Sequence, residues 1–231
     1  MKDSKLPIFS RLEVCPDAES LAAAAAQRIL AAAQDALAQR GRFSLALAGG
    51  STPRRCYERL RQAAFDWSRV DVYFGDERCL PVAHPGRNDV MAADAWLDRV
   101  PLPAANRHVI PAERGPEAAA QAYAEALVGA LPFDLVLLGL GEDGHTASLF
   151  PGNEALGRTE AVVPVFRAPK PPAERVSLSL DTLNSARRKL FLVSGAGKRD
   201  ILARLAADPA LPAARIHGAE WMVDRDAWPG A

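Results

Sequence analysis

Short apolar runs alternate along this chain with longer segments of helical character. The apolar runs, each predicted to form a strand, are residues 43–48, 70–74, 133–138, 176–180 and 189–194, with further candidates at 161–166 and 221–223. Helices are predicted over residues 17–40, 54–62, 89–97, 116–131 and 199–207. Apolar strands that alternate with helices are typical of a mostly parallel sheet covered by helices on both faces. The pattern therefore predicts an α/β fold.

The chain of 231 residues is long enough for one α/β domain and shows no linker or repeat, so we predict a single domain over residues 1–231. A formal net charge of zero gives no electrostatic reason to expect nucleic acid or a membrane as a partner. The first seven residues are not followed by the apolar region of a signal peptide, and no apolar run is long enough to span a bilayer. We expect a cytoplasmic protein, as a monomer or a small homo-oligomer.

Three cysteines, Cys15, Cys56 and Cys79, occur without CxxC spacing. An odd number at these positions argues against a disulfide framework and against a zinc site. Free thiols in a reducing compartment are the simpler interpretation. We predict no metal.

Polar segments, most of them glycine-containing, follow several predicted strands: residues 49–52, 75–78, 141–146 and 195–198. Each alone could be an ordinary turn. In an open parallel sheet, however, ligands bind beyond the carboxyl ends of the strands. Because these segments all follow strand ends on one edge, a single shared site explains them better.

Gly50, Ser51 and Thr52 lie between a strand and a helix start, where backbone N–H groups and the helix dipole favour a phosphate or a sugar hydroxyl. The segment is neither a Walker loop nor a GxGxxG fingerprint. Asp76 and Arg78 follow the next strand, and the planar guanidinium of Arg78 suits phosphate. In isolation, a solvated charged turn, or an ion pair that holds Arg78, is the preferred interpretation of the second segment.

His145 gives the strongest signal for chemistry. It follows a buried strand, in a loop rich in glycine, and Asp143 stands two positions earlier. Histidine titrates near neutral pH and can take a proton from water, while a carboxylate can fix its tautomer. Asp143 could equally cap the next turn. No GxSxG nucleophile elbow is present, which favours direct attack by water over an acyl-enzyme.

Two further cations are candidates for binding an anion. Arg175 begins a predicted strand, and Lys198 begins the last long helix after Gly195-Ala196-Gly197. A lysine is electrostatically unfavourable at a helix start, so a bound anion would explain it. A solvated lysine is the alternative.

These residues resemble the 6-phosphogluconolactonase family over nearly the whole chain. The matching segments are residues 47–53, 74–81, 88, 139–151, 175–179 and 195–198, and the stretch DGHTASLFPG at residues 143–152 is the most specific. The resemblance implies a Rossmann-like three-layer sandwich and a cofactor-free enzyme of the oxidative pentose phosphate pathway. The enzyme would hydrolyse 6-phosphoglucono-δ-lactone to 6-phosphogluconate.

The same resemblance implies the site. His145 would be the general base with Asp143 beside it. Arg78, Arg175 and Lys198 would bind substrate, chiefly its phosphate, together with residues 50–52. Asn88 matches a family position that lines the pocket, although its neighbours Arg87 and Asp89 depart from the family pattern. Donors for the oxyanion could come from backbone N–H groups of residues 49–51 or 141–144, or from a basic side chain.

Two other functions compete with the lactonase. The first is an aldose–ketose isomerase or deaminase of amino-sugar phosphates, whose similar loop continues Ile-Ala-Phe-Asn-Glu-Pro. Here residues 146–151 read Thr-Ala-Ser-Leu-Phe-Pro and lack the ring-opening glutamate. The second is a sugar-phosphate sensor without turnover, which would need neither Asp143 nor His145.

Overall fold

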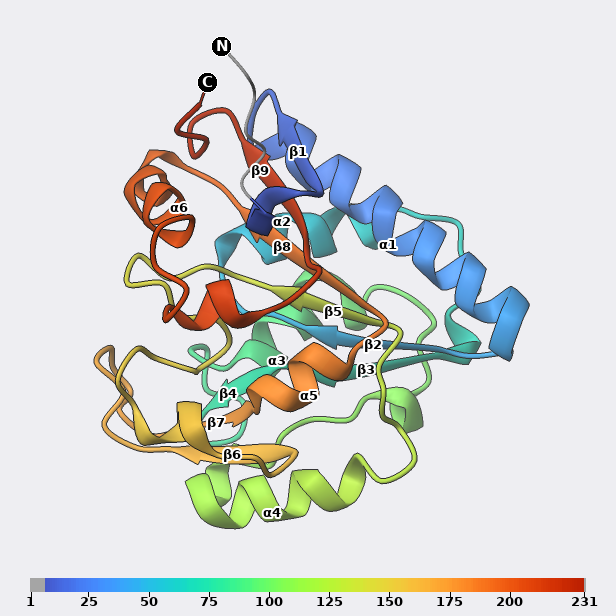
Figure 1. Ribbon diagram of the computed structural model, residues 1–231. Coiled ribbons are helices and arrows are strands. Elements are labelled where there is room, and N and C mark those ends of the chain that lie inside the picture. Colours follow the sequence, from blue (N-terminus) through green and yellow to red (C-terminus); the bar gives the residue numbers. More distant parts are fainter. Residues whose placement is uncertain (1–6, 231) are drawn as a thin grey trace.

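Six parallel strands form the central sheet of the computed structural model, which describes residues 7–230 (Figure 1). Their order across the sheet is β1 (Leu12–Cys15), β9 (Glu220–Asp224), β8 (Arg188–Val193), β5 (Leu135–Leu138), β2 (Phe43–Leu47) and β3 (Val70–Phe74). All neighbouring pairs run parallel. The central strand β5 is buried along its whole length, as its unbroken apolar run predicts. The predicted α/β class with a mostly parallel sheet is confirmed.

Helices flank this sheet. They are α1 (Ala18–Arg40), α2 (Ser51–Leu60), α3 (Asn88–Ala92), which continues as one π-helical turn to Leu97, α4 (Pro116–Ala126), α5 (Leu180–Ser185) and α6 (Arg199–Leu205). The first two pack against each other on one face. The connections through α5 and α6 cross the sheet in the opposite direction to α2, and right-handed crossovers therefore place them on the other face (Figure 1).

The longest helix, α1, begins and ends where the sequence predicts. The Asp17 side chain accepts the N–H of Ser20 at 2.7 Å, which caps the first turn. Gly41 ends the helix in the left-handed conformation, with φ of 75°. Alanines on its buried face allow close packing against the sheet and α2.

A second, antiparallel sheet of three strands lies beside the main one, with α4 packed against it (Figure 1). Its order is β4 (Asp76–Arg78), β7 (Arg175–Leu178) and β6 (Val162–Val165). Gly75 joins the two sheets. Its N–H donates to Leu47 O in the main sheet, and its carbonyl accepts the N–H of Leu178 from the small sheet, both at 2.8 Å. The small sheet therefore stands directly at the carboxyl edge of the large one.

Several local predictions were wrong. The segment 75–78, interpreted in isolation as a solvated turn, contains the buried strand β4. Helix α4 ends at Ala126 rather than at residue 131, because Gly129 adopts φ of 81° and Pro132 disfavours a helix before it. Neither β1 nor α5 was predicted.

The structure bears on two expectations from the sequence, the free cysteines and the lack of a membrane-spanning segment. The three cysteines are all unpaired, and Cys15 and Cys56 are buried. Within residues 7–230, no helix is long and apolar enough to cross a membrane. The expectation for the start of the chain lies mostly outside the described residues.

Candidate active site

The topology creates a crevice between β2 and β5. From β2 the chain moves to one side of the sheet, to β3, and from β5 it moves to the other, to β8. Loops leaving two such strands diverge, and ligands of open α/β sheets bind at that point. A pocket of about 320 Å³ lies here. Of the ten predicted site residues, seven line it: Gly50, Asp76, Arg78, Asn88, His145, Arg175 and Lys198.

The other three predicted residues lie outside the lining of this pocket. Asp143 stands behind His145. Ser51 and Thr52 begin α2, where Ser51 is exposed and Thr52 half-buried. Gly50, with φ of 109°, is the residue of this loop that reaches the pocket. Of the predicted loop 50–52, Gly50 is thus the part that lines the pocket in this structure.

His145 is held by Asp143. Its ring Nδ1 lies 2.5 Å from Asp143 Oδ1, and its backbone N–H donates to the same oxygen at 3.2 Å. Burial raises the pKa of the Asp143 carboxyl, but the hydrogen bonds and charge of His145 outweigh it and hold the pKa at about 2. An ionised carboxylate only accepts, so Nδ1 carries the proton and Nε2 is the free basic nitrogen.

The glycines of this loop leave space for the side chains of His145 and Asp143. A Cβ on Gly141 would lie 2.0 Å from His145 Nδ1 and 2.6 Å from Asp143 Oδ1. The N–H of Gly141 donates to His145 O at 2.8 Å, which closes the loop behind the ring. Phe150 packs against the imidazole, with ring centroids 4.4 Å apart. The imidazole is thus fixed by one charged partner, one backbone turn and one aromatic ring.

Asp76 ties together the loops around the pocket. Its carboxylate accepts the Ser148 hydroxyl at 2.5 Å and the Asn88 amide at 3.2 Å, and Asn88 also donates to Asp76 O at 2.9 Å. A Cβ on Gly49 would lie 2.0 Å from Asn88 Oδ1, so glycine lets the first loop close over Asn88. Asp76 itself is 6% exposed. Asp76 was predicted as a site residue from the sequence, but its hydrogen bond with Ser148 was not.

Glu77 supports the same wall from behind, a role that the sequence analysis missed. Oε1 accepts the N–H groups of Arg78 and Asn88 at 2.8 and 2.7 Å, and Oε2 accepts that of Asp89 at 2.9 Å. Burial raises the pKa of Glu77 to about 7, although the three N–H donors favour the ionised form. Glu77 therefore positions Arg78 and Asn88 without lining the pocket.

Arg87, which departs from the family pattern, is 2% exposed and structural. Its guanidinium binds the Asp89 carboxylate with two bonds of 2.9 Å and also reaches Glu113 and the carbonyl oxygens of Leu80 and Ile110. Arg87 and Asp89, the two residues that differ from the expected pattern, therefore form an ion pair that holds the loop before α3. It leaves Asn88 free to face the pocket.

Four cations line the pocket against one carboxylate, Asp76. Arg78 and Arg175 are directly paired across β4 and β7. Lys198 and Lys170 come from two other loops, and Lys170 was not predicted. Burial lowers the pKa of the Arg175 guanidinium, and Asp76 opposes that shift. The pocket is therefore strongly cationic in a chain with no net charge, which suits a multiply charged anion.

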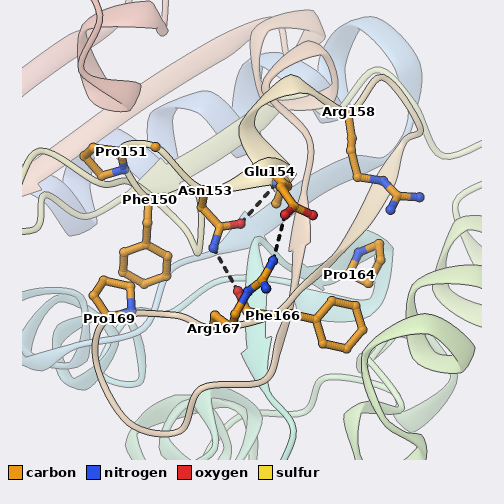
Figure 2. A pocket seen from close by; sticks show the side chains of 11 residues that line it. Phe150, Pro151, Asn153, Glu154, Arg158, Pro164, Phe166, Arg167 and Pro169 are labelled. Carbon is orange, nitrogen blue, oxygen red and sulfur yellow. Dashed lines mark hydrogen bonds and ion pairs between the residues drawn. The ribbon is translucent and has the colours of Figure 1, made fainter.

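A second hollow of about 270 Å³ adjoins the site and is lined in part by Phe150 (Figure 2). Its cations are already paired: Arg167 with Glu154 at 2.7 Å and Arg158 with Glu160 at 2.6 Å. No histidine lines it. Within residues 7–230, no cluster of three or more histidine, cysteine or acidic side chains is placed to hold a metal ion. The histidine pocket is thus the better candidate for catalysis.

The chain is similar to known proteins along most of its length. A family model described as "Glucosamine-6-phosphate isomerases/6-phosphogluconolactonase" matches residues 16–224. The 6-phosphogluconolactonase of Synechocystis sp. is 43% identical over 186 residues, 77% of each chain, and that of Nostoc sp. 39% over 208 residues, 86% of each. The crystal structure of 6-phosphogluconolactonase from Thermotoga maritima, 28% identical, matches with a TM-score of 0.87 over 93% of this chain and 99% of that one.

Proposed function

The chain belongs to the glucosamine-6-phosphate isomerase/6-phosphogluconolactonase family, and we propose that it hydrolyses 6-phosphoglucono-δ-lactone to 6-phosphogluconate in the oxidative pentose phosphate pathway. One observation carries the chemistry. The His145 ring lines a cationic pocket, and its Nδ1 is fixed by an ionised Asp143. This arrangement leaves a basic Nε2 for a proton from water.

The reaction proceeds through a tetrahedral intermediate. Nε2 of His145 takes a proton from water as the water oxygen attacks C1 of the lactone, and the carbonyl oxygen becomes an oxyanion. The intermediate then collapses, the bond from C1 to the ring oxygen breaks, and the imidazolium returns the proton to that oxygen. Asp143 stabilises the imidazolium between the two steps.

The oxyanion needs donors that are not already used. Within residues 141–144, the N–H groups of Gly141 and Gly144 already donate to His145 O and Gly141 O, which makes them less suitable as donors to the oxyanion. We favour the backbone groups of Gly49 and Gly50, which line the pocket, and the basic side chains as the donors.

General-base catalysis contributes only about 10²–10⁴-fold, so binding of the remote phosphate matters for positioning. We assign Arg78, Arg175 and Lys198 to binding of the substrate anion, and Asp76, Asn88 and Gly50 to the contacts with its sugar hydroxyls. Their convergence on one pocket supports this assignment. We expect the chain to form a single domain and to act in the cytoplasm as a monomer or a small homo-oligomer. We also expect catalysis without a cofactor.

The deaminase alternative is disfavoured by Phe150. This residue stands in the loop segment where the deaminase pattern has its glutamate, and its ring packs against His145 at 4.4 Å. No carboxylate for ring opening comes from that segment, residues 146–151. A binding protein without turnover is disfavoured by the His145–Asp143 pair, which binding alone does not require.

Turnover assays distinguish these three functions. Freshly prepared 6-phosphoglucono-δ-lactone and glucosamine 6-phosphate are offered separately, and acid release and ammonia release are followed against the spontaneous rates. The proposal expects rapid acid release and no ammonia. Ammonia release would establish the deaminase, and binding of 6-phosphogluconate without either activity would establish a sensor.

A further inference from the structure

Arg175 uses most of its guanidinium on the chain that precedes it. Nε donates to Pro172 O at 3.1 Å, and Nη2 donates to Lys170 O at 2.9 Å and to Pro171 O at 3.4 Å. The guanidinium carbon lies 5.4 Å from the centroid of Phe150, the ring that packs on His145. Arg175 therefore fixes three consecutive carbonyl groups relative to the catalytic histidine.

The loop held in this way carries Lys170 into the wall of the pocket. The Lys170 ammonium makes no ion pair or hydrogen bond with another residue between 7 and 230, and neither does that of Lys198. Burial lowers the pKa of the Lys198 ammonium, the Glu142 carboxylate opposes this, and the like charge of Lys170 lowers it further. Lys170 is exposed and Lys198 half-buried, and an anion bound between the two ammonium groups would relieve their mutual repulsion.

The neighbouring cation of the same loop behaves differently. Arg167 pairs with Glu154 at 2.7 Å and lines the adjoining hollow instead (Figure 2). The loop thus places one paired cation away from the catalytic pocket and one unpaired cation in it. This contrast indicates that the position of Lys170 is specific, rather than a general property of a basic loop.

We infer that Lys170 binds the phosphate of the substrate together with Lys198, and that Arg175, besides lining the pocket, holds the Lys170 loop in place. This inference rests on the proposed function, because it takes the bound anion to be a sugar phosphate. Lys170 then contributes to specificity for phosphorylated over unphosphorylated lactones. It does not take part in proton transfer.

The test compares two ligands that differ only in the phosphate. Calorimetry measures the binding of 6-phosphogluconate and of gluconate to the wild type, Lys170→Gln, Lys170→Arg and the control Arg167→Gln. We expect Lys170→Gln to weaken 6-phosphogluconate binding about tenfold, the usual effect of one charged hydrogen bond, and to leave gluconate binding unchanged. Lys170→Arg should restore most of the affinity, and Arg167→Gln should match the wild type.

Equal weakening of both ligands would place Lys170 at the reacting end, and unchanged binding of 6-phosphogluconate would remove it from the site. Either result overturns the inference. The binding readout is independent of turnover: a wild type that binds 6-phosphogluconate through Lys170 but hydrolyses no lactone overturns the proposed function alone. A folded wild type that does not bind 6-phosphogluconate overturns both.

Discussion

One oxygen of the Asp143 carboxylate accepts two hydrogen bonds from His145, from the ring Nδ1 at 2.5 Å and from the backbone N–H at 3.2 Å. The shared acceptor fixes the ring relative to its own backbone. Since the pKa of Asp143 is held at about 2, the carboxylate is ionised throughout the physiological range. The pair therefore sets both the orientation of the base and the charge that stabilises it once protonated.

Asp143→Asn should separate orientation from charge. The amide keeps the size of the side chain but loses the negative charge, and it can hold the ring in the wrong tautomer. We expect kcat to fall by roughly 10²-fold or more with little change in KM, because the loss affects the transition state. Steady-state kinetics check this, with circular dichroism to confirm the fold. A variant with the kcat of the wild type would contradict the assigned role.

Gly141→Ala should disable the same pair by crowding. The new Cβ would lie 2.0 Å from His145 Nδ1, so the imidazole must move. We expect a loss of kcat of at least about tenfold with the fold retained, since misplaced catalytic groups are costly. The matched control is Gly157→Ala, where a Cβ meets nothing within 4 Å. Equal activity of the two variants would show that the loop relaxes without loss.

Glu77→Gln should change how stability depends on pH. The folded-state pKa of about 7 lies above the ordinary value of 4.5, so the fold favours the protonated form. This group's contribution to stability is therefore complete below about pH 4.5 and is lost as the pH rises through about 7. The variant cannot ionise, so its stability relative to the wild type should rise over that range, by about 3 kcal/mol at most.

Urea unfolding at pH 5 and pH 8 measures this difference in the free energy of unfolding. The exposed carboxylate of Glu117 supplies the control, because Glu117→Gln should show the same offset from the wild type at both pH values. A Glu77→Gln offset that is also independent of pH would mean that Glu77 is ionised in the fold at pH 5.

Arg175→Lys should loosen the Lys170 loop while keeping a positive charge. A lysine ammonium lacks the planar fork that reaches Pro172 O and Lys170 O together. We expect faster hydrogen exchange of the Ala168 N–H, which donates to Ala173 O at 2.9 Å across this loop, and a KM raised several-fold, about 3- to 10-fold. Arg158→Lys, an exposed site with one ion pair, is the control. Unchanged exchange would show that the loop holds its place without Arg175.

Much of the fold was predictable because its signals are local. The apolar runs of β2, β3, β5 and β8 were found within one or two residues, since parallel strands are buried on both faces. Asp17 and Gly41 mark the ends of α1 by local hydrogen bonding and backbone conformation. Residues whose roles depend on neighbours in the sequence, such as His145 and Asp143, could therefore be predicted from the sequence.

The small sheet was predictable only in part, because strands were predicted at residues 161–166 and 176–180, where β6 and β7 lie, but not at β4. Strand β4 reads Asp-Glu-Arg and carries no apolar signal, because its burial comes from polar contacts with distant residues. The role of Glu77 depends on α3, and that of Lys170 on carbonyl contacts with Arg175 across a turn. Such contacts between loops leave no periodic pattern in a single sequence.

The most direct test of the central claim compares the wild type with His145→Ala in the hydrolysis of freshly prepared 6-phosphoglucono-δ-lactone. Formation of 6-phosphogluconate is followed above the spontaneous rate. We predict rapid turnover by the wild type and a loss of kcat of about 10²–10⁴-fold in a variant that remains folded and still binds 6-phosphogluconate. Undiminished turnover by His145→Ala would contradict the assignment of the base, and a folded wild type that does not accelerate the reaction would contradict the lactonase itself.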